Sequence, residues 1–136
     1  MSESNKTIVQ QFWDLYNQGA WDQLDSLVSE GYIHHNNASQ LSLEQFKRGA
    51  AWFRAGMPDF HVVIEDMVAE ADKVAVRLVG HGTHLGSFFG ETPTAKPVVV
   101  YGVFIYRMQD NRIVEDWETM DEHHFREQLG LATLES

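Results

Sequence analysis

The chain has 136 residues, within the usual ~100–200 of one domain, and we expect residues 1–136 to form a single unit. Its formal charge of −10 disfavours binding to nucleic acid or to an anionic membrane, and no apolar run approaches the ~20 residues of a membrane span. The absence of cysteine excludes disulfides and thiolate chemistry. Because the N-terminal segment lacks the apolar core of a signal peptide, the expected location is the cytoplasm.

The first 56 residues have the apolar periodicity of helices, with large side chains recurring at spacings of three and four. Ser42 and Gln45 form a capping-box pattern, which predicts that a helix starts just after Ser42. Gly56 and Pro58 are expected to end this helix. The elements predicted in this part of the chain are helices over about 8–16, 22–28 and 43–56, and an extended segment at 32–35.

From Asp59 onward the apolar period changes to two, which indicates strands separated by polar turns. The predicted strands are Phe60–Glu70, Lys73–Phe89, Pro97–Met108 and Arg112–Met120, followed by a short helix from Asp121 to Gly130. Helices followed by an antiparallel meander predict the α+β class. Gly80, Gly82 and Gly86 indicate a bend in the longest strand, and a strongly bent sheet wrapped on helices would enclose a pocket.

Six short motifs follow one another between Tyr32 and Gly130. They are Tyr32–Asn36, Met57–Phe60, Arg77 followed by Gly82–Gly86, Gly90–Thr94, Ile113-x-Glu115-x-Trp117-x-x-x-Asp121, and Gln128–Gly130. Their order and spacing resemble the SnoaL-like polyketide cyclase family, also described as predicted ester cyclases, within the nuclear-transport-factor-2-like superfamily. Two positions depart from the family pattern. Ala95 stands where glycine is usual, and Asn111 replaces the glycine of a common Asp-Gly turn.

The resemblance implies a cone-shaped α+β barrel, in which a strongly curved, mostly antiparallel sheet wraps on the N-terminal helices. It also implies a homodimer formed through the outer sheet face, with neither a metal nor an organic cofactor. Characterised members close a ring by an intramolecular aldol reaction on a polyketide ester, using an Asp as general acid/base. The expected partner is therefore a small hydrophobic or aromatic carbonyl ligand. A non-catalytic ligand-binding or dimerisation module, and an isomerase or hydrolase, are alternatives on the same fold.

Asp121 matches the acid/base Asp of the family. In a regular strand it shares one side with Ile113, Glu115 and Trp117, so it would lie at the wall of the pocket. An aspartate partly desolvated beside an indole would have a raised pKa, which brings a weak base nearer to working pH. The alternative is that Asp121 only caps the last helix, a contribution of about 1 kcal/mol.

Two histidines and an ion pair are further candidates for the site. His35 and His84 could donate a proton to a substrate carbonyl or orient Asp121, because imidazole titrates near neutral pH. Either could instead be structural, with hydrogen bonds to the backbone. A buried Glu115 requires a partner, and Arg77 could form an internal salt bridge with it or orient a carbonyl of the ligand.

Tryptophans could provide the surface for a flat apolar ligand. Trp13 and Trp52 lie on helix faces that should cover the sheet, where they could roof a pocket beside Trp117 or belong to the core. The seven histidines do not predict a metal site, because adjacent pairs diverge and residues three apart in a strand lie on opposite faces. No His-Glu-x-x-His pattern occurs.

Overall fold

The computed structural model describes residues 2–37 and 39–131. The helices are α1 (Ser2–Asn17), the 3₁₀ helix η1 (Trp21–Leu27), α2 (Leu43–Gly56) and α3 (Glu122–Gln128). The strands are β1 (Val28–Asn36), β2 (Ser39–Leu41), β3 (His61–Glu70), β4 (Lys73–Thr83), β5 (Pro97–Gln109) and β6 (Arg112–Met120). The predicted α+β class is confirmed. Across the described residues, no helix is long and apolar enough to cross a membrane.

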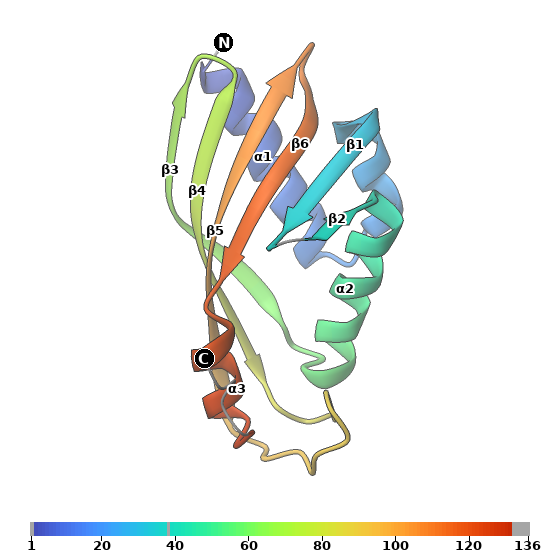
Figure 1. Cartoon of the computed structure of the whole chain (residues 1–136), viewed down its shortest axis with the longest axis vertical. Coiled ribbons are helices and arrows are strands. Elements are labelled where there is room, and N and C mark those ends of the chain that lie inside the picture. Colours follow the sequence, from blue (N-terminus) through green and yellow to red (C-terminus); the bar gives the residue numbers. More distant parts are fainter. Residues whose placement is uncertain (1, 38, 132–136) are drawn as a thin grey trace.

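The strands form one six-stranded sheet in the order β2-β1-β6-β5-β4-β3. β1 runs parallel to β6, and every other neighbouring pair is antiparallel. Figure 1 shows β3, β4 and β5 side by side along the long axis, with α1 crossing behind the upper half of the sheet. β1 and β2 stand next to α2, and α3 lies at the lower end near the loop that joins β4 to β5.

The core lies between the helices and the inner face of the sheet. Val9, Phe12, Trp13 and Tyr16 form the buried stripe of α1, at the spacing that the helical periodicity predicts. They meet aromatic side chains of β5, and the rings of Trp13 and Phe104 lie edge to face with centroids 5.2 Å apart. Because burying a large apolar side chain contributes roughly 1.5–3 kcal/mol, this aromatic contact anchors α1 on the sheet.

The predicted capping box of α2 and the predicted turn between β5 and β6 are both confirmed. Each depends only on residues that are neighbours in the sequence. The Ser42 side chain accepts a hydrogen bond from Gln45 N, and Gln45 Oε1 accepts one from Ser42 N, which completes the capping box of α2. Asp110 and Asn111 join β5 to β6 with φ values of 52° and 61°. Aspartate and asparagine tolerate this left-handed region, so the turn forms without glycine.

The strand predicted over Lys73–Phe89 ends at Thr83, so that prediction was too long. Both carboxylate oxygens of Asp59 accept hydrogen bonds from Thr83, one from its backbone N and one from Oγ1, each at 2.7 Å. Beyond this point the chain leaves the sheet, and Leu85 N and Gly86 N donate to Gly56 O. The strand therefore stops because the end of α2 takes over its backbone hydrogen bonds.

Candidate functional site

A cavity of about 290 Å³ opens between α2, α3 and the inner face of the sheet. Its volume is near the lower end of the ~300–1,000 Å³ that is usual for small-molecule pockets. Nine aromatic side chains line it: Trp13, Tyr16, Phe46, Trp52, Phe53, Phe60, Phe89, Phe104 and Phe125. The longer polar side chains of the lining are His34, Asn36, Gln45, Glu118 and Glu122. This composition suits a flat, largely apolar ligand with a few polar groups.

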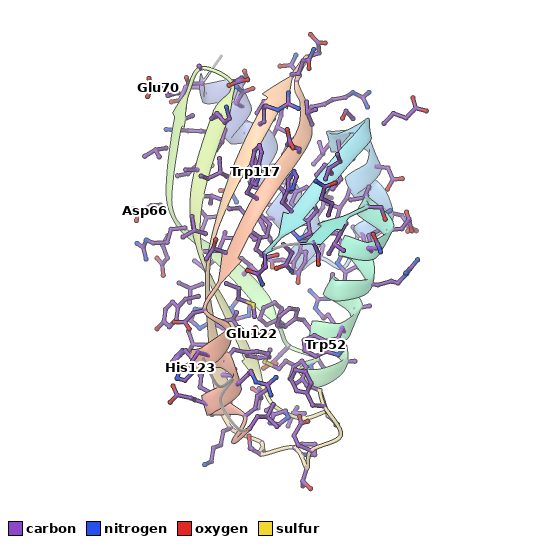
Figure 2. The ribbon with its side chains drawn as sticks, in the orientation of Figure 1. Trp52, Asp66, Glu70, Trp117, Glu122 and His123 are labelled. Carbon is purple, nitrogen blue, oxygen red and sulfur yellow. The ribbon has the colours of Figure 1, made fainter. Side chains whose placement is uncertain are left out.

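Exposure separates the deep end of the cavity from its mouth. Trp13 and Phe104 are each 4% exposed, whereas Trp52 is 37% and Phe89 is 49% exposed. Figure 2 shows Trp52 on α2 and Glu122 at the start of α3 at about the same level, on the two helices that flank the mouth. A ligand would therefore enter between α2 and α3 and reach toward α1.

A buried polar cluster occupies the wall at the deep end. His34 Nδ1 lies 2.5 Å from Asp116 Oδ1, and His34 Nε2 lies 3.1 Å from Glu118 Oε1. Tyr32 Oη donates to Asp116 Oδ2 at 2.5 Å. The parallel pairing of β1 with β6 brings these groups together, because His34 pairs with Asp116 and Asn36 with Glu118. The imidazole is thus held between two carboxylates.

Burial and pairing act in opposite directions on the charge of His34. Burial alone would lower its pKa, but the hydrogen bonds to Asp116 and Glu118 outweigh burial and raise the pKa to about 9. Burial raises the pKa of Asp116, which is fully enclosed. Burial and the neighbouring Asp116 also raise the pKa of Tyr32, so its hydroxyl stays a donor at neutral pH. The cluster therefore keeps an imidazolium at neutral pH.

Glu118 is the carboxylate of this cluster that reaches the cavity. Its side chain is 16% exposed, whereas His34 and Asp116 are 2% and 0% exposed. Tyr32 fixes Asp116, Asp116 fixes the ring of His34, and His34 in turn fixes Glu118. A carboxylate held in this way at the wall of an apolar cavity has the arrangement of a general acid/base.

The predicted candidates on β6 and at its end, Trp117 and Asp121, do not line the cavity. Asp121 is exposed, and its Oδ1 accepts a hydrogen bond from His124 N at 3.0 Å, which caps α3. Trp117 is 38% exposed and does not line the cavity. Figure 2 shows Trp117 on the upper part of β6, away from the mouth. The prediction that this side of β6 faces the pocket is therefore wrong, while the acid/base role of Asp121 stays a prediction.

The prediction chose the wrong face of β6 because this strand contains one extra residue relative to β5. Met108 pairs with Ile113 and Arg107 with Glu115, so Val114 has no partner of its own on β5. Such a bulge reverses the alternation of side chains along the strand. Ile113 faces inward before the bulge, and Asp116 and Glu118 face inward after it. Even spacing from Ile113 therefore selects the wrong face.

His35 and Glu115 form a second cluster, on the outer face. His35 stacks on Trp117 with ring centroids 5.1 Å apart, and its Nε2 lies 2.7 Å from Glu115 Oε2. Arg107 donates to the other oxygen of Glu115 at 2.9 Å. Arg77 instead pairs with Asp66, because β5 separates β4 from β6. The expected pair of Arg77 with Glu115 is absent, and neither residue lines the cavity.

His84 lies in the loop between β4 and β5 and is fully buried. Its Nε2 is 2.9 Å from Glu91 Oε1, and its Nδ1 is 3.1 Å from Thr94 Oγ1. Glu91 also accepts hydrogen bonds from the backbone N of Phe88 and Phe89. Although burial raises the pKa of Glu91, these bonds outweigh it and lower the pKa to about 2. His84 thus positions the loop that carries Phe89 to the mouth.

Of the predicted site residues, Trp13 and Trp52 line the cavity. Sequence reasoning missed His34, Asp116 and Glu118. The sequence pattern that could have identified them is alternation along two strands. Tyr32, His34 and Asn36 share one side of the first strand, and Asp116 and Glu118 share one side of the second. In residues 2–37 and 39–131, no three His, Asp or Glu side chains converge in a way that could hold a metal ion.

The curved sheet, the covering helices and the enclosed aromatic cavity define a cone-shaped α+β pocket protein. A sequence model of the SnoaL-like polyketide cyclase family matches residues 6–129. The chain therefore belongs to the SnoaL-like polyketide cyclase family. A search of the curated proteins gives no match.

Solved structures share this fold over nearly the whole chain. AclR from Streptomyces galilaeus, described as a candidate hydroxylase, superposes with a TM-score of 0.88 at 22% identity, covering 96% of this chain and 98% of its own. IdmH from Streptomyces antibioticus, described as a candidate polyketide cyclase, gives 0.86 at 26% identity, covering 93% and 99%. TsrD from Streptomyces laurentii gives 0.82 at 24% identity, covering 96% and 97%. The likeness to AclR and TsrD concerns the fold alone.

Proposed function

We propose that the protein is a cofactor-independent, cyclase-type enzyme that acts on a small aromatic carbonyl compound, with Glu118 as its general acid/base. The observation that carries this proposal is the position of Glu118. Its carboxylate faces an aromatic cavity and is bonded to a buried histidine. Asp116 bonds the other ring nitrogen of that histidine, and Tyr32 donates a hydrogen bond to Asp116. The membership of the SnoaL-like polyketide cyclase family supports the same class of reaction.

The reaction is an intramolecular aldol closure. Glu118 takes a proton from the carbon next to one carbonyl group, and the electron pair of the C–H bond moves onto the carbonyl oxygen as an enolate. The enolate carbon then attacks a second carbonyl carbon of the same molecule, which forms the new C–C bond. The resulting alkoxide takes the proton back from Glu118. The product is an isomer of the substrate, and no co-reactant is consumed.

The groups around Glu118 can assist both the abstraction of the proton and the formation of the new C–C bond. The imidazolium of His34 lies 3.1 Å from Glu118 and places positive charge near the site where the enolate develops. Asn36, the neighbour of Glu118 across β1 and β6, adds an amide side chain to the cavity lining. The aromatic walls can hold a folded substrate with its two carbonyl groups close together, which gives an intramolecular reaction a large effective molarity.

A ligand-binding module without catalysis is the second candidate function. The observation that favours it is the saturation of His34, whose two ring nitrogens are both bonded to carboxylates. Such an ion-pair network can simply fix the packing of an inner sheet face. In that case the cavity would bind the same aromatic ligands without moving a proton.

Proton exchange distinguishes the two candidates, and 2-tetralone is a suitable probe because its C1 protons are acidic and its two rings are small. The exchange of these protons for deuterium is followed by ¹H NMR in D₂O. We expect the wild-type protein to accelerate exchange above the buffer rate, and Glu118→Gln to lose about 10²–10⁴-fold of that acceleration. Glu118→Gln keeps the shape of the side chain, and its melting temperature serves as the folding control. Equal acceleration by both proteins would remove Glu118 from the mechanism.

A further inference from the structure

Phe88 fills the space behind the mouth end of the cavity. It is 8% exposed, and it does not itself line the cavity. Its ring contacts four of the nine aromatic side chains that do. The ring centroids are 4.7 Å from Trp52, 5.4 Å from Phe125, 6.2 Å from Phe53 and 6.5 Å from Phe89. The side chains at this end of the cavity therefore rest on one buried ring that lies behind them.

The end of α2 has no side chain at the place where the Phe88 ring lies. A Cβ atom added to Gly56 would overlap the tip of that ring. The loop comes this close through backbone contacts, because Leu85 N and Gly86 N both donate to Gly56 O, at 3.1 and 2.9 Å. Gly86 in turn lies against Ala55 O, which leaves no room for a side chain there. The main chain thus fixes the ring of Phe88 against α2.

The loop also holds the backbone of Phe88 from its other side. Glu91 Oε1 accepts a hydrogen bond from Phe88 N at 2.8 Å, and Glu91 Oε2 accepts one from Phe89 N at 2.6 Å. The ring of His84, which bonds Glu91, lies 5.6 Å from the ring of Phe88. Figure 1 shows this loop at the lower end of the molecule, beneath α2 and next to α3. Because packed interiors deform little, a ring held in this way fixes the side chains that rest on it.

The space that the cavity offers to a ligand is short. Its volume of about 290 Å³ is near the lower end of the ~300–1,000 Å³ of small-molecule pockets. A long aromatic ligand would extend through the mouth, where Trp52 and Phe89 are already partly exposed to solvent. An additional ring would be buried only if the wall at the mouth end moved back. Phe88 occupies the space into which that wall would move.

We propose that Phe88 limits the length of the aromatic ligand, so that the cavity encloses two fused rings and leaves a third in solvent. Phe88 is then a positioning residue that acts through Trp52, Phe53 and Phe125 and determines the size specificity of the cavity. The inference rests on the proposed function only for the cavity as the ligand site, and it adds the number of rings. It concerns binding, so it holds whether or not a proton is moved.

Two ligands that differ by one fused ring test the proposal. 2-Naphthol has two rings and 2-anthrol has three in a line, and the fluorescence of each ligand reports its dissociation constant. We expect Phe88→Ala to raise the affinity for 2-anthrol relative to 2-naphthol at least about tenfold. One more ring buries more than the ~55 Å² of apolar surface that corresponds to this factor. Leu24→Ala, at a fully buried position of η1 that does not line the cavity, should leave the ratio unchanged.

Gly56→Ala provides a second, independent measurement. In the Phe88→Ala background its methyl group enters the vacated space, and it should lower the ratio again by about fourfold, the effect of one buried carbon. General loosening of the protein would not be reversed by this added methyl group. Should Phe88→Ala fail to fold, Phe88→Leu empties less space and should raise the ratio by about threefold.

Other results would overturn the proposal. An unchanged ratio in Phe88→Ala, or in Phe88→Leu where only that variant folds, would show that the wall does not rest on Phe88. An equal rise in Leu24→Ala would show that any core truncation admits the third ring. Proton exchange of 2-tetralone by the wild type, together with an unchanged ratio, would support the proposed function and overturn this inference. A raised ratio without proton exchange in the wild type would support the role of Phe88 and overturn catalysis.

Discussion

His34 holds a proton that an isolated histidine would lose near neutral pH. Two carboxylates bond its ring nitrogens inside an apolar wall, and their attraction exceeds the cost of burying the charge. The consequence for function is that Glu118 faces the cavity with a fixed cation behind it. Removing His34 would leave Asp116 buried without its charged partner, a change that typically destabilises a protein by about 3–5 kcal/mol.

This arrangement makes stability depend on pH in a defined direction. The pKa of His34 is about 9 in the folded protein and about 6.5 in the unfolded chain, so its contribution is complete below pH 6.5 and is lost as the pH rises through 9. We expect the free energy of unfolding to fall by at most roughly 3 kcal/mol across that interval. Urea unfolding at several pH values measures the fall, and His34→Gln should remove it. A flat profile between pH 6.5 and 9 would contradict the imidazolium.

Asp121 illustrates how much of the role of a single residue could be predicted from the sequence. Its two readings, acid/base residue and helix cap, were both available from its place at the junction of a strand and a helix. The structure shows the cap. Deciding between them required the direction of the side chain, which depends on the register between β5 and β6. That register is a long-range property and has no signature in the residues around Asp121.

At the scale of secondary structure, β6 determines which residues reach the cavity. Alternation correctly groups Asp116 with Glu118 and Glu115 with Trp117, because both pairs lie beyond the bulge. It fails only across Val114, where the strand carries one extra residue. Most strand and helix positions were predictable because local propensity and periodicity agreed. The end of β4 was not, since contacts from Asp59 and Gly56 decide it.

The Asp121 side chain caps α3 and should contribute measurably to the stability of the protein. Asp121→Ala removes the acceptor for His124 N and should lower the free energy of unfolding by about 1 kcal/mol. Asp121→Asn keeps a good capping side chain and should cost only a few tenths of a kcal/mol. Denaturant unfolding of the two variants measures the difference. Equal stability of Asp121→Ala and the wild type would mean that the cap contributes nothing to α3.

The carboxylate of Glu91 holds the loop over residues 84–96 in place. Glu91 accepts hydrogen bonds from the backbone N of Phe88 and Phe89 and from His84. We expect Glu91→Gln to weaken all three and to reduce the hydrogen-exchange protection of both phenylalanine amides. Glu65→Gln, at an exposed position of β3, is the matched control and should leave their protection unchanged. Unaltered protection in Glu91→Gln would show that other contacts hold the loop.

For the whole molecule, the sheet separates two surfaces with different chemistry. The inner surface encloses the cavity, whereas the outer surface exposes apolar side chains on two neighbouring strands. The exposed fractions there are 46% for Tyr101, 43% for Val103, 41% for Ile105 and 38% for Trp117. An extended apolar patch of this kind is typical of a surface that another protein covers. It fits the homodimer that the family resemblance implies, which stays a prediction.

Light scattering coupled to size-exclusion chromatography tests that prediction. We expect a mass near twice the chain mass of 15.6 kDa, and a monomer for Ile105→Glu, which places a charge in the middle of the patch. Glu65→Gln, away from the patch, should remain dimeric. A wild-type protein that elutes with the mass of one chain would contradict the dimer.

In the proposed mechanism the carboxylate of Glu118 inside the cavity, and not that of Asp121 at the helix cap, moves the proton. The rate of deuterium exchange at C1 of 2-tetralone, measured for Glu118→Gln and Asp121→Asn at equal saturation, tests it most directly. We expect a loss of at least about 100-fold for Glu118→Gln and a rate within about twofold of the wild type for Asp121→Asn. A wild-type rate in Glu118→Gln, or a comparable loss in Asp121→Asn, would contradict it.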